Sequence, residues 1–340
     1  MHKGQAPENG PYSALVVSQG PEEVFTREVR QLDISRLPPG DLLIHVLWSS
    51  LNYKDALAAT GRPGVAVGYP LTPGIDAAGV VEKSASAGFA PGDPVIVSGR
   101  DLGIRVPGGF GQYIRVPFSW ALRPPAGLTL RECMTFGTAG ITAALSIRAL
   151  QVHGVSPERG KVLVTGATGG VGSFAVAILS KLGYEVVAST GKVDQVGYLI
   201  SLGARETLSR LEMADTSGKA LLKEKWAGVV DAVGGTILST AIRSTMHGGS
   251  VAACGNASSP DLPLTVFPFI LRGVQLLGID SSQCPASERR ELWDAIAGPW
   301  KPDRLAWMAS ECSLRDLNSR IDEMMQGRIT GRVVINLEES

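Results

Sequence analysis

The 340-residue chain has few cysteines, and they are far apart. No two of Cys133, Cys254, Cys284 and Cys312 form the C-x-x-C pair of a zinc ribbon. A disulfide framework is not expected in a chain of this size without a secretion signal. We expect free thiols, buried or partly exposed.

Histidine is scarce as well, and the four histidines do not cluster: His2, His45, His153 and His247. A catalytic zinc needs about three soft or imidazole ligands from the protein. The sequence therefore predicts no metal site.

The chain also lacks a charge excess, since 32 basic side chains balance 32 acidic ones. This balance gives no reason to expect nucleic acid or an anionic membrane as a partner. No apolar run approaches the roughly 20 residues that span a bilayer. The polar N-terminus has no apolar core of a signal peptide. We expect a cytoplasmic protein with a disordered tail at residues 1–11.

Two textures follow each other along the chain. The first third has short β-rich segments between Pro-Gly, Gly-Asp and Gly-Gly turn signals, which predicts a small, partly closed β domain. The segments are residues 13–18, 41–49, 77–82, 94–97 and 111–116. From residue 134, strand-like and helix-like segments alternate, starting with a helix at 138–150, and predict a parallel sheet covered on both faces.

These textures predict an α/β protein of two domains. Residues 134–282 would form a doubly wound nucleotide-binding domain, with strands at 161–164, 185–189, 228–232, 250–253 and 274–279. Residues 12–133 would form the β domain, joined by residues 283–340, which are too short to be a domain. This tail is polar and helical before a last strand at 332–337.

A strand, a glycine-rich turn and an apolar helix follow one another in residues 161–182. The spacing is Gly166-x-x-Gly169-x-x-Gly172. Glycines let the backbone approach a pyrophosphate, and the helix N-terminus offers free N–H groups to it. We expect dinucleotide contacts from this turn, against the alternative of a tight structural turn; the candidates are Thr168, Gly169, Gly170 and Val171.

The end of the next strand indicates which dinucleotide binds. NAD sites usually carry an acid about 20 residues after the glycines, on the ribose 2′-hydroxyl. Here the strand ends in Ser189, Thr190, Gly191 and Lys192, which suit the 2′-phosphate of NADPH. Arg210 is a further candidate. The nearby Asp194 leaves NADH as an alternative cofactor. For Lys192 and Arg210 the alternative interpretation is a solvated charge on the surface.

Several segments resemble the medium-chain dehydrogenase/reductase superfamily. They include residues 50–55, 73–81, 108–111 and 138–140, the glycine turn and the closing Gly331-Arg332. The resemblance implies a Rossmann domain and a GroES-like, partly closed β-barrel domain. Zinc alcohol dehydrogenases of the superfamily carry an early cysteine and a His-Glu pair after the Pro-Gly turn. Those places here hold Asn52 and Ile75-Asp76, so the resemblance is to the zinc-independent members.

Residues 48–57, 268–272 and 278–281 resemble more closely the acryloyl-CoA reductases, which are often labelled quinone oxidoreductases. The sequence departs from this subgroup in its N-terminal extension. It also departs in the loop Asn256-Ala-Ser-Ser259, where the subgroup carries more glycine.

The resemblance implies NADPH-dependent hydride transfer to the β-carbon of an α,β-unsaturated thioester, without metal. It places Asn52 and Tyr53 on the substrate side of the nicotinamide, with Tyr53 as hydrogen-bond or proton donor and Asn52 as an orienting group. The alternative interpretation of Tyr53 is a structural aromatic residue at the domain interface. Asp55 and Asp76 are expected to be structural hydrogen-bond acceptors. Further cofactor contacts are expected from Asn256, Ile270, Ser281 and Arg332.

Some alternatives stay open at this point. A quinone is the rival substrate, and a non-catalytic NADPH-binding protein is the rival class. The apolar strand at 274–279 is expected at the edge of the sheet, where pairing with a second copy would form a homodimer. The domains are expected to meet between the glycine turn and Asn52–Tyr53, since doubly wound sheets bind ligands at the carboxyl ends of their strands.

Overall fold

The computed structural model describes residues 9–339 and divides into two units. The first unit ends at Thr138 and resumes at Leu305, and the second is Ala139–Arg304. The sequence predicted the domain boundaries at 133/134 and 282/283. Residues 283–304, which were expected in the first unit, belong to the second. Of the expected disordered tail, residues 1–8 lie outside the described residues, and Pro11 already begins a strand.

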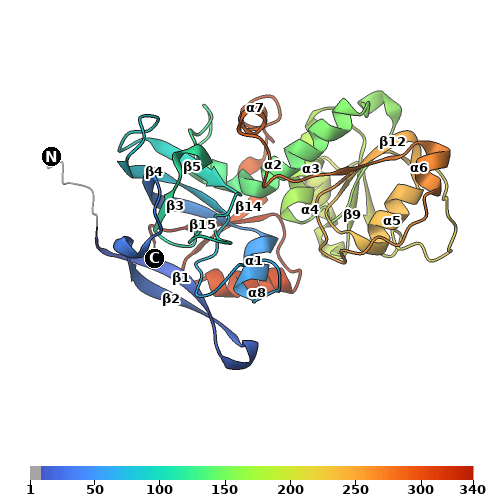
Figure 1. Ribbon diagram of the computed structural model, residues 1–340. Coiled ribbons are helices and arrows are strands. Elements are labelled where there is room, and N and C mark those ends of the chain that lie inside the picture. Colours follow the sequence, from blue (N-terminus) through green and yellow to red (C-terminus); the bar gives the residue numbers. More distant parts are fainter. Residues whose placement is uncertain (1–8, 340) are drawn as a thin grey trace. The chain divides into compact units, whose positions relative to one another are not determined.

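The first unit contains a seven-stranded sheet with the order β14-β15-β3-β4-β5-β7 and with β6 paired to β3 (Figure 1). β3 and β4 lie at its centre, and their inward side chains form a core with residues of β15, α1 and α8. The bounds are β3 Leu42–Leu51, β4 Asp76–Ser84, β5 Pro94–Ser98, β6 Tyr113–Val116, β7 Ala121–Leu122, β14 Ala309–Ser313, β15 Arg332–Asn336, α1 Tyr53–Ala59 and α8 Leu317–Met325.

A two-stranded hairpin of β1 (Pro11–Gln19) and β2 (Phe25–Asp33) completes the first unit. β1 is buried along most of its length and contains the β-rich segment predicted at residues 13–18. β2 was not predicted, because its polar sequence FTREVRQLD lacks the alternation of a half-buried strand. Its pairing with β1, continuous from Pro11–Asp33 to Gln19–Phe25, makes it a strand despite this exposure.

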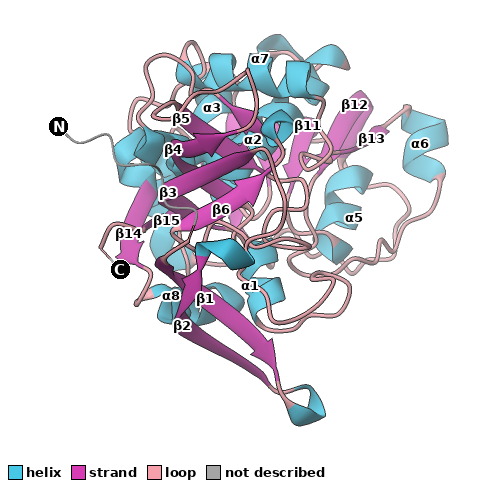
Figure 2. Ribbon diagram, turned by 60° about the vertical axis from the view of Figure 1, so that its left-hand side comes forward, coloured by secondary structure: helices cyan, strands magenta, loops and turns pink. Residues whose placement is uncertain are grey.

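The second unit contains a six-stranded parallel sheet with the order β10-β9-β8-β11-β12-β13 (Figure 2). Numbered along the chain, this is 3-2-1-4-5-6, the order of dinucleotide-binding sheets. The strands are β8 Val162–Val164, β9 Val186–Thr190, β10 Glu206–Ser209, β11 Trp226–Asp231, β12 Thr245–Ala253 and β13 Gln275–Gly278. The helices are α3 Gly170–Lys181, α4 Val196–Ser201, α5 Gly235–Arg243, α6 Phe267–Arg272 and α7 Ala286–Ala297.

The longest helix, α2 (Leu130–Val152), begins in the first unit and continues in the second. It starts well before residue 138, where the sequence predicted its beginning. Gly137 (φ 48°) interrupts the helical backbone, so α2 consists of a part before this residue and a part after it. By length and composition α2 is long and apolar enough to cross a membrane. However, 78% of its most apolar window is buried inside the protein, as in the core helix of a globular domain.

Candidate active site

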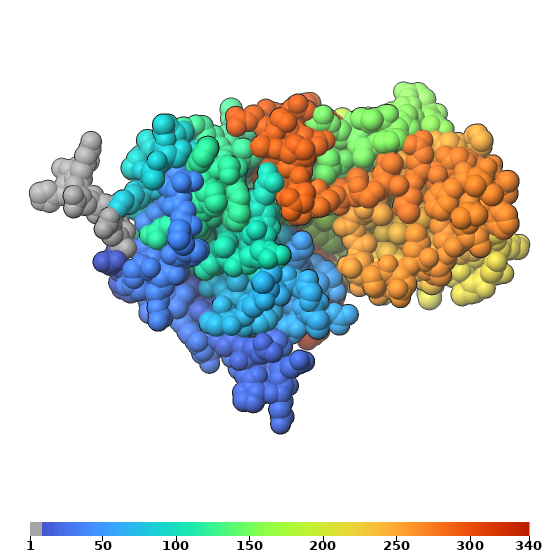
Figure 3. Space-filling view, viewed as in Figure 1, coloured from blue at the N-terminus to red at the C-terminus, as the bar shows by residue number. Residues whose placement is uncertain are grey.

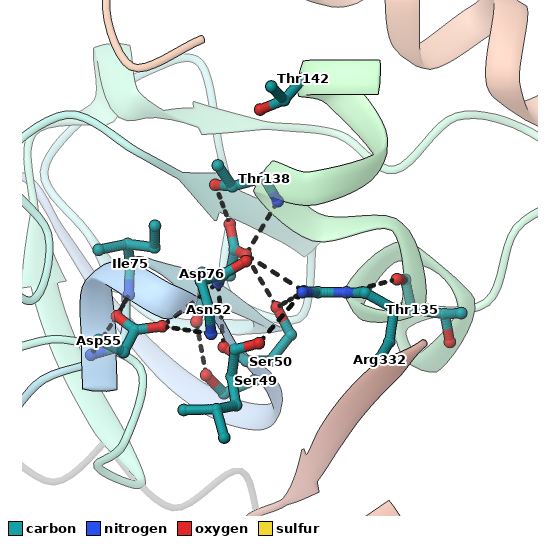
Figure 4. Close-up of polar contacts among 12 residues, drawn as sticks. Ser49, Ser50, Asn52, Asp55, Ile75, Asp76, Thr135, Thr138, Thr142 and Arg332 are labelled. Atoms are coloured by element: carbon teal, nitrogen blue, oxygen red, sulfur yellow. Dashed lines mark hydrogen bonds and ion pairs between the residues drawn. The ribbon is translucent and has the colours of Figure 1, made fainter. Parts of the chain in front are cut away.

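A buried carboxylate, Asp76, lies where β4 begins, between the ends of β3 and β5. Its Oδ2 accepts hydrogen bonds from Ser50 Oγ (2.8 Å) and Asn52 Nδ2 (2.8 Å). Thr138 donates twice, from its backbone N to Oδ2 (2.9 Å) and from Oγ1 to Oδ1 (2.7 Å) (Figure 4). Asp76 is therefore a structural acceptor, which joins segments far apart in the sequence.

Arg332, the first residue of β15, supplies the positive charge of this cluster. Its guanidinium donates to Thr135 O (3.1 Å), Leu51 O (3.1 Å) and Ser50 Oγ (2.7 Å), and Nη2 lies 4.0 Å from Asp76 Oδ2. Burial lowers the pKa of Arg332, and Asp76 and Asp55 oppose that effect. At 3% exposure the side chain holds its own unit together, a different placement from the predicted cofactor contact.

Asp55 is the second buried carboxylate, in the first turn of α1. It accepts hydrogen bonds from the backbone N of Asn52 (2.8 Å), Gly74 (3.2 Å) and Ile75 (2.8 Å). Asp55 thus caps α1 and ties it to the Pro-Gly turn before β4. Burial, and then the charge of Asp76, raise the pKa of Asp55 to about 7.

The surroundings of Asn52 determine which way its amide group points. Nδ2 lies within hydrogen-bond distance of Asp76 Oδ2 (2.8 Å), Ser50 O (3.2 Å) and Asp55 Oδ2 (3.3 Å). All three partners are acceptors, so they must face the NH₂ group and not the oxygen. Asn52 therefore turns its Oδ1 away from the carboxylates, on the side of the backbone N of Asp55 in the capping box of α1.

Tyr53 follows Asn52 as the first residue of α1. Its side chain is 39% exposed, and its hydroxyl has no hydrogen-bond partner among residues 9–339. The structure thus places a partly exposed phenol side chain on the residue that directly follows the fixed amide of Asn52. These are the two residues that the sequence proposed for catalysis.

Gly137 was missed as a functional position in the sequence. A Cβ at this residue would lie 2.6 Å from Asp76 Oδ2 and 2.7 Å from Ser50 Oγ. Only glycine combines this close approach with the positive φ at the kink of α2. The available signal was a glycine inside an apolar helical stretch.

In the second unit, the glycine turn connects β8 to α3. Gly166 has a φ of 58°, and a Cβ on Gly172 would lie 2.3 Å from Gly166 O. Gly169 is the N-cap of α3, so the following residues present the free N–H groups of a helix N-terminus. Thr168 Oγ1 lies 3.1 Å from Thr190 Oγ1, which brings the glycine turn and the end of β9 together.

Asp231, at the end of β11, was also missed. It accepts a hydrogen bond from Thr165 Oγ1 (2.6 Å), at the end of β8, and another from Gly234 N (2.8 Å). Burial raises the pKa of Asp231. It joins the ends of β8 and β11, where the strand order reverses and ligands bind in this fold.

The end of β9 borders a small pocket of about 30 Å³, lined by Gly166, Ser189, Thr190, Gly191, Arg210, Val233 and Ile237. The guanidinium of Arg210 lies against Gly191, since a Cβ there would be 3.2 Å from Arg210 Nε. The partly buried Lys192 has its pKa lowered by burial, with Asp194 acting in the opposite direction. The structure thus brings the predicted NADPH-selecting residues to one place.

The remaining predicted cofactor contacts are divided. Ser281 follows β13, accepts a hydrogen bond from Thr142 Oγ1 (2.7 Å), and lies at the carboxyl end of the sheet, as does the Asn256 loop after β12. Ile270 lies elsewhere, in α6, where Arg272 donates to Arg243 O beside the amino end of β12. The structure therefore does not bring Ile270 together with the others.

The positions that hold zinc ligands in zinc-type relatives do not suit a metal here. They contain an amide and a carboxylate whose oxygens already accept hydrogen bonds from Ser50, Asn52 and Thr138. Within residues 9–339 no group of three or more His, Cys, Asp or Glu side chains is placed to hold a metal ion. The donor set does not fit zinc.

Two family descriptions match this chain: "Alcohol dehydrogenase GroES-like domain" over residues 38–126 and "Zinc-binding dehydrogenase" over residues 170–298. AcuI of Ruegeria pomeroyi, named an acrylyl-CoA reductase, is 44% identical over 96% of this chain and 99% of its own length. YhfP of Bacillus subtilis, which carries a quinone oxidoreductase name, has the same identity and coverage. The structure of Escherichia coli YhdH with bound NADPH superposes with a TM-score of 0.93, at 42% identity, over 95% and 99% of the two chains.

The fold and the two sites define an oxidoreductase with a GroES-like and a Rossmann unit. The chain belongs to the medium-chain dehydrogenase/reductase family, in the zinc-independent group that includes AcuI and YhfP.

Proposed function

We propose that the protein reduces the activated C=C bond of acryloyl-CoA to propanoyl-CoA with NADPH. The observation that carries this proposal is the partly exposed side chain of Tyr53, on the residue that follows the fixed amide of Asn52. A thioester already polarises its conjugated double bond. Such a substrate needs positioning and one O–H donor rather than a Lewis acid.

The second unit supports NADPH as the cofactor. Thr168–Val171 would face the pyrophosphate, and Ser189–Lys192 with Arg210 would face the 2′-phosphate. No carboxylate stands at the tip of β9 to repel that phosphate. YhdH was crystallised with NADPH, whereas YhfP was crystallised with NAD, so cofactor preference needs measurement on this chain.

When bound, NADPH supplies the hydride, the electron pair that the reaction requires. The β-carbon of the substrate accepts it, and the π electrons of the C=C bond shift toward the thioester oxygen. The resulting enolate takes one proton at its α-carbon, which completes the saturated thioester. The Tyr53 hydroxyl would donate a hydrogen bond to the developing oxyanion or deliver that proton.

Asn52 acts in this scheme as a positioning residue. Its Oδ1 is an acceptor, so it would orient a hydroxyl group of cofactor or substrate rather than stabilise an enolate oxygen. Asp76 and Asp55 fix its amide group, and Arg332 donates to Ser50, which also donates to Asp76.

Quinone reduction is the second candidate, because YhfP is as similar to this chain as AcuI is. NADPH oxidation followed at 340 nm with acryloyl-CoA, and separately with small quinones, separates the two. We expect a higher kcat/KM for acryloyl-CoA. A preference for quinones would overturn the proposal, and no turnover with either would leave a non-catalytic NADPH-binding protein.

We also propose a homodimer. β13 is an edge strand of the parallel sheet, and apolar side chains are exposed on it and on the preceding segment: Val266, Phe267, Ile270, Leu271 and Leu276. Such an edge favours pairing with a second copy. Sedimentation at micromolar concentration should give the dimer mass, and a monomer there would contradict the proposal.

A cytoplasmic location completes the proposal. None of the four cysteines is in a disulfide bond, and three of them are buried. Free thiols are typical of a reducing compartment.

A further inference from the structure

Four basic residues of the first unit lie on α1 or in the loops that follow α1 and β5, and we call them the basic rim: Lys54, Arg62, Arg100 and Arg105. In the segments that contain them, residues 53–75 and 99–110, the acidic residues are Asp55 and Asp101. Asp55 is fully buried, so it does not neutralise the surface. In a chain with zero net charge, this is a local positive excess.

Two members of the rim lie near the candidate catalytic residues. Lys54 directly follows Tyr53 on α1 and is exposed. Arg100 comes two residues after Ser98, which pairs with Asp76 at the end of β5. Both therefore leave the sheet at the end where Asn52 is held.

The other two members lie farther from Tyr53. α1 has seven residues, so its far end is about 10 Å from Tyr53 at 1.5 Å per residue. Arg62 is held at that end by a hydrogen bond from its N to Leu57 O (2.9 Å). The loop after Arg62 is joined to the loop of Arg105 by Val67 N donating to Ile104 O (3.2 Å), and Figure 3 shows the two segments, light blue and teal, on one face.

The charges of the rim have little internal compensation. Among residues 9–339, the side chains of Lys54, Arg62 and Arg100 have no ion pair or hydrogen bond. Arg105 pairs with Asp101 at 3.3 Å, but these side chains are 60% and 50% exposed. A pair this exposed contributes little to stability. The rim is therefore available to an external anion.

We propose that the basic rim binds the phosphates of the coenzyme A part of the substrate, an inference that rests on the proposed function. A coenzyme A thioester carries its phosphates at the far end of a flexible pantetheine arm. Lys54 and Arg100 lie near the thioester end, and Arg62 and Arg105 suit the distant phosphates. A small quinone has no group that needs such a surface, so the rim favours the acyl-CoA substrate.

The test uses the double variant Arg62→Glu/Arg105→Glu, with Arg315→Glu as the matched control. Arg315 is an exposed arginine of the same unit, without an ion pair in the described chain, beyond the opposite end of β14. Each protein is assayed with acryloyl-CoA and with the acryloyl thioester of N-acetylcysteamine, which has the reacting group but no phosphates. The KM for NADPH is measured in parallel.

We expect the double variant to raise the KM for acryloyl-CoA about tenfold, because each lost exposed contact has a modest effect and reversal adds repulsion. kcat should stay unchanged, since the phosphates interact equally in ground and transition states. The truncated thioester, NADPH and the control should show no change. Added salt should raise the wild-type KM for acryloyl-CoA and flatten the difference between the proteins.

In the double variant, an unchanged KM for acryloyl-CoA would overturn this proposal. So would an equal rise in the KM for the truncated thioester, or a rise in the KM for NADPH alone. Failure of the proposed function has a different signature, because the wild-type protein would then reduce neither thioester. The two failures are therefore distinguished in the same experiment.

Discussion

The cluster around Asp76 in the first unit and the glycine turn in the second differ in whether their polar groups have partners within the protein. Around Asp76, side chains satisfy one another: Ser50, Asn52 and Thr138 all donate to a carboxylate that is fully buried. In the glycine turn, the backbone at the start of α3 offers N–H groups without side-chain partners. The first site is closed, whereas the second is complete only with a ligand.

This difference shows how the two sites reach their precision. The glycine turn needs space for a ligand, so its requirement is the absence of Cβ atoms at a few positions. The Asp76 cluster needs polar atoms brought together without water, and a polar group left without its partner there costs about 1–3 kcal/mol. We therefore expect substitutions in the first unit to affect turnover and stability, and those in the second to affect cofactor binding.

The largest effect should come from Tyr53→Phe, which removes one hydroxyl from the residue that follows Asn52. If this hydroxyl serves as general acid, kcat should fall roughly 10²–10⁴-fold with little change in NADPH affinity. Steady-state kinetics and NADPH titration by fluorescence measure both. Tyr113→Phe, the same change on a ring stacked with His45, is the control. An unchanged rate would mean that water supplies the proton.

A second effect concerns the pH dependence of stability that the buried carboxyl group of Asp55 produces. The pKa of Asp55 is raised to about 7, above its unfolded value of 3.8, so the folded state holds the proton more tightly. Its contribution to stability is present below pH 3.8 and is lost as pH rises through about 7. The loss is up to about 4 kcal/mol. Urea unfolding at pH 5 and pH 8 measures roughly two thirds of this loss. Asp55→Asn should flatten the dependence, and the same slope in both proteins would refute the assignment.

Gly137→Ala tests how tightly the cluster is closed. The new Cβ would meet Asp76 Oδ2 at 2.6 Å and force a positive φ on alanine, so we expect a loss of about 3 kcal/mol in unfolding free energy. Gly127→Ala is the control, because Gly127 has a φ of 86° but open space around it, which should cost about 1 kcal/mol. Equal losses in urea unfolding would show that the cluster tolerates displacement.

The smallest effect should appear at the open site. NADPH should bind more tightly than NADH, and Lys192→Ala should narrow the gap by about 1.5–3 kcal/mol, the loss of one charge-assisted contact. Dissociation constants for both cofactors measure it. Lys223→Ala, an exposed lysine before the amino end of β11, should leave the gap unchanged. Equal affinity for NADPH and NADH in the wild-type protein would refute the reading of the β9 tip.

The sequence by itself predicted the features that depend on neighbours in the chain. The glycine turn between β8 and α3, the acid-free end of β9 and the succession of apolar strands and helices are all local patterns. The pair Asn52–Tyr53 came from resemblance, again within one short segment. Exposed strands such as β2 escaped, because pairing rather than side-chain pattern makes them strands.

Tertiary structure decided the contacts between distant segments. Asp76 meets Thr138 across 62 positions, and Arg332 meets Ser50 across 282, at separations that no local pattern encodes. The same is true of Arg210 against Gly191, and of Gly137, whose small size matters only because Asp76 lies behind it. Local backbone preference and burial pattern are encoded along the chain, whereas the partner of a buried polar group depends on which distant segments folding brings together.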